Sequence, residues 1–218
     1  MASADFFRKI STSPQKVSLF LPINGLNTDN SPVGKLSRFT RKFTVEEYEK
    51  MATEGIIKPD EKVELIRGEI IKMSPMGTSH ASSVDRLIQL FYQKLGQKII
   101  LRVQNPIRLN NNSQPEPDLS LLIPRSDFYV AAHPCPQDIY LIIEVSDSTI
   151  DYDHYTKIPL YAEANIQEVW IVNLKEECLE VYRHPLHGSY QAIQKYYRGE
   201  SIFIESFPAI EFTIADYA

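Results

Sequence analysis

Two acidic residues stand at the ends of apolar segments that have the length of buried strands. Asp118 follows Pro117 and opens "DLSLLI", and Glu144 closes "YLIIE". A sheet that pairs these segments brings both carboxylates to one edge. Oxygen ligands of this kind suit Mg²⁺ or Mn²⁺, which keep several waters and bind one or two protein carboxylates beside substrate phosphates. The sequence therefore predicts a divalent metal site, and the backbone carbonyl of Val145 is a further candidate ligand where the strand ends.

A lysine follows Glu144 on the next element. Lys157 lies about two turns into "DYDHYTKIPLYAEAN", which has a helical pattern. Its side chain can reach back toward the Glu144 strand, where an ammonium could orient an attacking water, lower its pKa or neutralise charge on a phosphate. Simpler interpretations remain open: an Asp after Pro commonly ends a turn, and Lys157 could be an exposed helix residue. Glu144 is harder to explain in this way, because an unpaired Glu in a buried apolar strand is costly.

Strand and helix patterns alternate along the chain that must position these residues. "FTVEEYEKMATEG", with Thr44 as N-cap, and the segment with an apolar stripe from Val84 to Leu95 are predicted helices. The predicted strands lie in "KVELIRGEIIKMS", "KIILRVQNPIRL", "DLSLLI", "DIYLIIEVS", "EVWIVN", "CLEVYRH", "SYQAIQKYY" and "ESIFI". Trp170 in "EVWIV" is expected to pack against a helix, with its N–H needing a partner. This order predicts an α/β (mixed α+β) fold, a mixed central sheet flanked by helices, with one parallel crossover from "LIIEV" to "EVWIV".

The composition indicates one domain with a tail. The 218 residues are 43% hydrophobic, enough for one substantial core. Residues 1–38 are interpreted as an extended or poorly ordered arm and residues 39–218 as the folded domain. No apolar run has the length of a membrane span or a signal peptide, so we expect a soluble cytoplasmic protein that does not contact a membrane. The net charge of −5 argues against coating of nucleic acid by bulk electrostatics, although a local basic cleft remains compatible with it.

Five motifs in order resemble a known family. "VELIRGEIIKMSP", "GTSH", "PEPDLSLL", "LIIEVSDSTIDYDHYTK" and "YAEANIQEVWIVN" are similar to the successive motifs of the Uma-two family, which is assigned to the PD-(D/E)xK, or restriction-endonuclease-like, superfamily. The resemblance runs from about Phe43 to about Arg183. It implies a metal-dependent nuclease core in which Asp118 corresponds to the Asp of the PD pair and Glu144 to the second acidic residue. Ser146 stands where the superfamily has its lysine, and Lys157 matches a lysine that has moved to the following helix.

The resemblance also implies supporting residues. Glu64 matches an upstream acidic residue of the family and would be a further metal ligand or a group that supports the metal site; the alternative is a cross-strand pair with Lys72. His80 matches the family's histidine at the start of the long helix, where it could contact a phosphate, carry a proton or simply hydrogen-bond at the helix start. Gln104 is expected to lie beside Asp118 and hold a metal-bound water. The remaining histidines show no metal-ligand spacing and are interpreted as surface residues: His133, His154, His184 and His187.

These residues together predict a magnesium- or manganese-dependent DNA endonuclease of the PD-(D/E)xK type, acting as a homodimer because a site that reads a double strand commonly works in pairs. The alternative from another class keeps the fold without turnover: a nuclease-derived module that binds nucleic acid or a protein partner. The acidic net charge and the displaced lysine favour this alternative. A glycosidase with two carboxylates would need a sugar-stacking aromatic cleft, which the arrangement of the two strands does not require.

Overall fold

The computed structural model describes residues 40–214, so the predicted arm at residues 1–38 lies outside the described residues. The helices are α1 (Val45–Thr53), α2 (Thr78–Leu95), α3 (Ile150–Tyr152) and α4 (Ile158–Glu163), with the π-helical turn Asp153–Lys157 between α3 and α4. The strands are β1 (Val63–Ile66), β2 (Glu69–Lys72), β3 (Ile100–Val103), β4 (Leu119–Leu122), β5 (Ile139–Ser146), β6 (Glu168–Asn173), β7 (Cys178–Leu186), β8 (Ser189–Tyr197), β9 (Ser201–Phe203) and β10 (Glu211–Thr213).

A six-stranded mixed sheet forms the centre of the described fold, with strand order β3-β4-β5-β6-β7-β8. All neighbours are antiparallel except β5 and β6, which are parallel and are joined through α3 and α4. The predicted mixed α+β fold with a single parallel crossover is therefore confirmed. Two short hairpins, β1–β2 and β9–β10, form separate two-stranded sheets. The sequence analysis does not predict β10, although it predicts the equally short β9.

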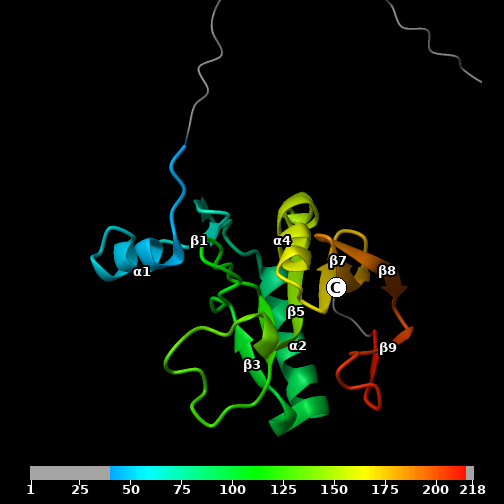
Figure 1. Cartoon of the computed structure of the whole chain (residues 1–218). Helices are drawn as coiled ribbons and strands as arrows, with labels where there is room; N and C mark the ends of the chain where they lie inside the picture. Colours follow the sequence, from blue (N-terminus) through cyan, green and yellow to red (C-terminus); the bar gives the residue numbers. More distant parts are fainter. Residues whose placement is uncertain (1–39, 215–218) are drawn as a thin grey trace, which may run out of the picture. The chain divides into compact units, whose positions relative to one another are not determined.

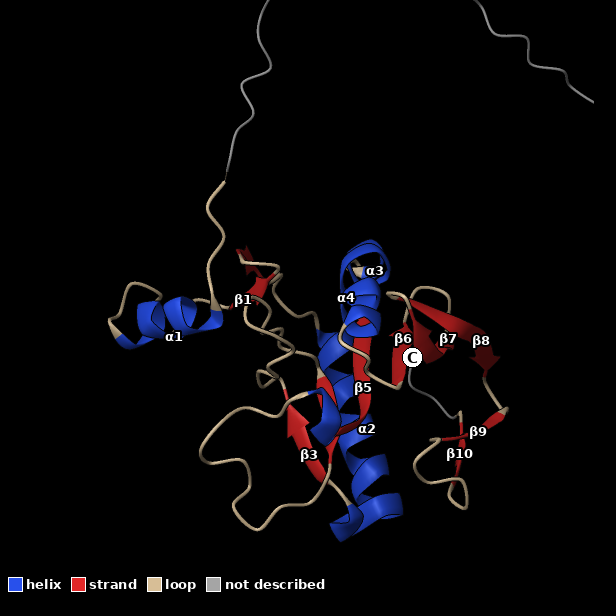
Figure 2. Cartoon of the chain, in the orientation of Figure 1, coloured by secondary structure: helices blue, strands red, loops and turns tan. Residues whose placement is uncertain are grey.

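The two faces of the sheet are covered by different helices (Figures 1 and 2). On one face, Leu87 and Phe91 of α2 belong to the same buried cluster as Trp170 of β6, as the predicted apolar stripe requires. On the other face, Leu160 and Tyr161 of α4 belong to a cluster with strand residues of β5 and β6. Burying apolar side chains on both sides of β5 and β6 explains why these strands read as continuous apolar runs.

The N–H of Trp170 has the partner that the sequence analysis requires. It donates to Glu168 Oε1 at 2.7 Å, and the same carboxylate accepts from Arg183 and from the backbone N–H of Glu205. Glu168 is itself buried, and a buried carboxylate is costly unless it is paired. These three donors provide the hydrogen bonds that it needs. Because Glu205 lies between β9 and β10, this network ties the terminal hairpin to the central sheet.

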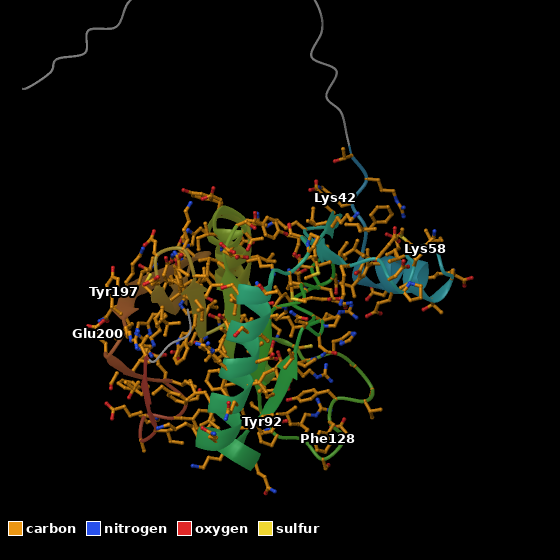
Figure 3. All side chains as sticks on the ribbon, turned by 180° about the vertical axis from the view of Figure 1, so that it is seen from behind. Lys42, Lys58, Tyr92, Phe128, Tyr197 and Glu200 are labelled. Atoms are coloured by element: carbon orange, nitrogen blue, oxygen red, sulfur yellow. The ribbon has the colours of Figure 1, made fainter. Side chains whose placement is uncertain are left out.

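Two pairs of labelled side chains lie on opposite sides of the described fold (Figure 3). Lys42 and Lys58 lie beside α1, whose N-terminus is closed by a capping box between Thr44 and Glu47. Tyr197 and Glu200 lie at the other end, where the Glu200 carboxylate accepts from the backbone N–H of Tyr197 in the turn after β8. Within residues 40–214, no helix has both the length and the apolar content needed to cross a bilayer.

The helix after β5 is interrupted, although the sequence pattern predicts a regular one. Pro159 is the second residue of α4, and proline has no N–H and clashes with the carbonyl four residues earlier. The wider π-helical turn Asp153–Lys157 lies directly before it, where that conflict would arise. Both ends of this turn are buried against the sheet, so the interruption sets the position of Asp153 and Lys157.

Candidate metal centre

A cavity of about 520 Å³ opens between the β1–β2 hairpin, the start of α2, the strands β4 and β5, and the α3–α4 helix. Apolar and polar groups share its wall, which is typical of binding pockets. The residues singled out in the sequence all line this one cavity: Glu64, His80, Gln104, Asp118, Glu144, Val145 and Lys157. Folding thus gathers side chains from six separate segments of the chain.

The register between β4 and β5 brings Asp118 to Glu144. Leu119 pairs with Ile143 in antiparallel strands, so the residues just beyond this pair lie opposite each other. The backbone N–H of Asp118 points at Glu144 Oε2 at 3.4 Å, and the N–H of Val145 donates to Asp118 Oδ2 at 2.9 Å. β5 continues to Ser146, so Val145 lies one residue before the end of the strand rather than at its end.

Two side chains hold the other oxygen of Asp118. His80 Nε2 lies 2.8 Å from Asp118 Oδ1, and Gln104 Nε2 donates to the same oxygen at 3.2 Å. Burial alone would raise the pKa of the Asp118 carboxyl, but the hydrogen bond and charge of His80, the Val145 N–H and the charge of Lys157 hold it below its ordinary value. The hydrogen bond to Asp118 in turn raises the pKa of His80, against the effect of burial. Asp118 is therefore an ionised carboxylate in a fixed orientation.

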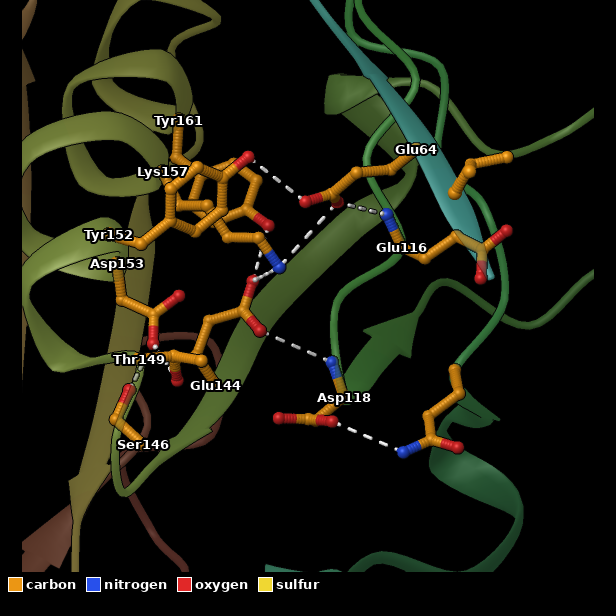
Figure 4. A network of polar contacts seen from close by, with 12 residues as sticks. Glu64, Glu116, Asp118, Glu144, Ser146, Thr149, Tyr152, Asp153, Lys157 and Tyr161 are labelled. Atoms are coloured by element: carbon orange, nitrogen blue, oxygen red, sulfur yellow. Dashed lines mark hydrogen bonds and ion pairs between the residues drawn. The ribbon is translucent and has the colours of Figure 1, made fainter. Parts of the chain in front are cut away.

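Glu144 and Lys157 form a buried pair at the centre of the network (Figure 4). Lys157 Nζ lies 3.1 Å from Glu144 Oε1, which also accepts from the Tyr161 hydroxyl at 2.5 Å. Burial raises the pKa of Glu144 to about 8 despite the neighbouring ammonium, with further increases from Asp153 and Asp118. Burial lowers the pKa of Lys157, but the surrounding carboxylates, Glu144 first, outweigh it, so the net shift is upward. Lys157 therefore carries its charge inside the protein.

Glu64 approaches the same ammonium from the β1–β2 hairpin. Its Oε2 lies 3.6 Å from Lys157 Nζ and accepts from the Glu116 N–H at 3.1 Å, while its Oε1 accepts from the Tyr152 hydroxyl at 3.1 Å. The alternative pair with Lys72 has no support, since Glu64 faces Ile71 across the hairpin and its carboxylate is buried. In Figure 4 the Lys157 ammonium lies between Glu64 and Glu144, so these two carboxylates share one cation.

The donor set fits a divalent cation on the Asp118 side of Glu144. Several buried or partly buried carboxylates surround a single buried lysine, and the repulsion among them contributes to the raised pKa of Glu144. Oxygen atoms of Asp118 and Glu144 and the Val145 carbonyl are ligand types that Mg²⁺ accepts. Among residues 40–214, the three acidic or thiol side chains that already meet at metal-ligand spacing are elsewhere: Glu176, Cys178 and Glu180. Lys195 contacts both of those carboxylates and offsets part of their charge.

The match to a family model decides the classification. A model described as "Putative restriction endonuclease", for the family Uma2, matches residues 45–215, most of the chain. The chain belongs to the Uma-two family. A solved structure described as "a putative nuclease belonging to DUF820" from Anabaena variabilis has a TM-score of 0.62 and 17% sequence identity, covering 80% of this chain and 97% of the other. At this identity the likeness shows a shared fold, the restriction-endonuclease-like one. A comparison with curated proteins finds no match.

In this Uma-two protein the structure adds side chains that sequence reasoning did not place in the site. Tyr161 and Asp153 are not among the site residues predicted from the sequence, yet the Tyr161 hydroxyl donates to Glu144 and Asp153 accepts from Ser146 and Thr149 beside the cavity. Tyr152 adds its hydroxyl to Glu64. A signal was present: Asp153, Lys157 and Tyr161 recur every four residues and so share a helix face.

Proposed function

We propose that this Uma-two protein is a divalent-metal-dependent endonuclease that hydrolyses phosphodiester bonds of DNA. Asp118, Glu144 and the Val145 carbonyl would hold Mg²⁺ or Mn²⁺, with Glu64 in a supporting position. The observation that carries the proposal is the convergence of Asp118, Glu144 and Lys157 in one cavity, with more carboxylates than buried cations. Family membership and the shared fold support it.

Each side chain has a role that follows from its contacts. A bound divalent ion would lower the pKa of a water and withdraw charge from a phosphate oxygen. Lys157, fixed by two carboxylates, would supply positive charge at the point where the phosphate becomes more negative. His80 and Gln104 keep Asp118 in one orientation, and His80 could also accept or donate a proton near neutral pH. By analogy with the superfamily, the products would be a 5′ phosphate and a 3′ hydroxyl. A homodimer is part of the proposal, since two sites are needed to cut both strands together.

The first test is cleavage by the purified full-length protein. Plasmid and linear DNA incubated with Mg²⁺ or Mn²⁺ should be cut, with a 5′ phosphate on the product, and EDTA should stop the reaction because the carboxylates alone provide no activated water. Gel electrophoresis and end-group analysis measure this. Binding of DNA without any cutting, in either metal, would instead favour the alternative of a silent nuclease-fold module, to which the net charge of −5 and the pairing of Lys157 with two acids lend support.

The affinity of the site for a divalent metal should increase as the pH rises. The pKa of Glu144 is about 8 in the metal-free protein, so below this pH the carboxyl mostly carries a proton that a cation must displace. The affinity for Mg²⁺ should therefore rise from pH 6 to about 8 and then level off, by up to about tenfold per pH unit for release of one proton. Isothermal titration calorimetry in two buffers of different ionisation enthalpy counts the released protons. An affinity that is constant over this range would contradict the displacement of a proton from Glu144 by the cation.

A further inference from the structure

His154 is held against the central sheet, although its sequence context suggested a surface residue. Its Nε2 lies 2.7 Å from Glu180 Oε2 of β7, and its side chain is 30% exposed. Its ring also packs near Tyr182, with ring centroids 6.5 Å apart. A second histidine that approaches a glutamate is different: His184, on β7, is 63% exposed and lies 3.6 Å from Glu205. His154 therefore makes a short, partly buried contact at a defined place.

The partner of His154 is a rigidly held carboxylate. Glu180 is 2% exposed, and its two oxygens accept from the Tyr182 hydroxyl at 2.7 Å and from Asn173 Nδ2 at 3.0 Å, with Lys195 Nζ at 3.3 Å. Burial raises the pKa of Glu180, but these hydrogen bonds, with that of His154, lower it to about 2. An ionised Glu180 can only accept, so His154 Nε2 is the donor. Glu180 thus offers a fixed negative point on the sheet.

His154 lies inside the π-helical turn that carries Lys157. The turn Asp153–Lys157 is held on one side by Asp153, which accepts from Ser146 at the end of β5 and from Thr149 just before α3. It is held on the other side by His154, which bonds to β7. A π-helical turn lacks the usual hydrogen-bond pattern, so its shape depends on such contacts more than that of a regular helix does. Lys157, at the end of this turn, has its ammonium between Glu64 and Glu144.

We propose that His154 and Glu180 are positioning residues that fix the π-helical turn and so hold the Lys157 ammonium in the site. The inference rests on the proposed function for its catalytic consequence, but the placement of Lys157 can be measured without any activity. Neither residue of the pair lines the cavity, so we expect its effect to pass through the backbone of the turn. We call the His154–Glu180 contact the anchor of the turn. This chain would need it because Lys157 comes from an irregular helix and not from the neighbouring strand.

The test compares His154→Ala, His154→Asn and His154→Gln with a matched control, His184→Ala. Lys157 is buried, so a water-soluble amine-reactive reagent should label it slowly in the metal-free parent, as mass spectrometry would show. We expect labelling of Lys157 to become about tenfold faster in the Ala and Asn variants. The labelling rate of the Gln variant should be close to that of the parent, because the longer Gln side chain can still donate an amide N–H to Glu180. The single-turnover cleavage rate should fall about 10- to 100-fold in the same variants with DNA affinity nearly unchanged.

The outcomes separate the two proposals. If Lys157 is labelled in His154→Ala and His154→Asn no faster than in His184→Ala, at a temperature where all variants are folded by circular dichroism, the anchor is wrong. If the parent cuts no DNA while labelling still follows the expected order, the anchor stands and the nuclease proposal fails. Equal loss of cleavage in the Gln and Ala variants would also count against the anchor, because a retained donor should restore the position of the turn.

Discussion

Replacement of Asp118 by asparagine is expected to reduce DNA cleavage by about a thousandfold or more. A metal ion contributes several kcal/mol to the stabilisation of the transition state, and about 4 kcal/mol corresponds to about a thousandfold in rate. The asparagine would keep the shape of the side chain, and the His80 ring can exchange its donor and acceptor roles to suit the new amide. The fold should therefore persist while the charge that binds the ion is lost. Single-turnover kinetics and calorimetry with Mg²⁺ measure the two effects.

The control for this experiment is Asp127→Asn, which removes a carboxylate paired with Arg125 in a loop outside the cavity. It should cut DNA like the parent. Glu144→Gln provides a second variant of the site, and it should lose metal binding in the same way while it keeps the hydrogen bond with Tyr161. If Asp118→Asn and Asp127→Asn cut DNA at equal rates, Asp118 has no catalytic role and the two-carboxylate mechanism is refuted.

Replacement of Lys157 by methionine should affect both stability and activity. Removing one partner of a buried ion pair costs about 3–5 kcal/mol of unfolding free energy, because the remaining charges are left uncompensated. Here Glu64 and Glu144 lose the ammonium they share, and the full cost applies above about pH 8, where Glu144 is ionised. Cleavage should fall about a hundredfold or more, as for other groups that stabilise developing charge. Urea unfolding followed by circular dichroism, together with cleavage assays, tests the prediction.

The instability of Lys157→Met should also depend on pH and on metal. The lysine lowers the pKa of Glu144, so without it the pKa in the folded state rises further above the ordinary value of 4.5. A carboxyl with a raised folded pKa favours folding when protonated, and this advantage is lost as pH rises. The deficit should therefore stay nearly constant below about pH 8, the pKa of Glu144 in the parent, and grow above it, and Mg²⁺ should reduce it. Lys42→Met, at an exposed pair with Glu69, should unfold like the parent. A deficit that does not change with pH would contradict the coupling between Lys157 and Glu144.

The sequence alone determined most of the element order and several of the residues that line the cavity. Buried strands and amphipathic helices leave periodic apolar patterns, and an acid at the end of an apolar strand is recognisable because it needs a partner. Asp118, Glu144 and Lys157 were identifiable for this reason, and the ordered motifs pointed to Glu64 and His80. The parallel crossover between β5 and β6 also followed, since a strand–helix–strand order has few compact solutions.

Only the tertiary structure decided how these groups contact one another. The pairing of one lysine with both Glu64 and Glu144, the Tyr161 hydroxyl on Glu144 and the His154–Glu180 contact join residues far apart along the chain. Local sequence patterns do not predict such contacts, because the contacts depend on strand register and on which helix face packs against the sheet. The π-helical turn is similar: Pro159 predicts a disturbance, but contacts with two different strands set where the turn places Lys157.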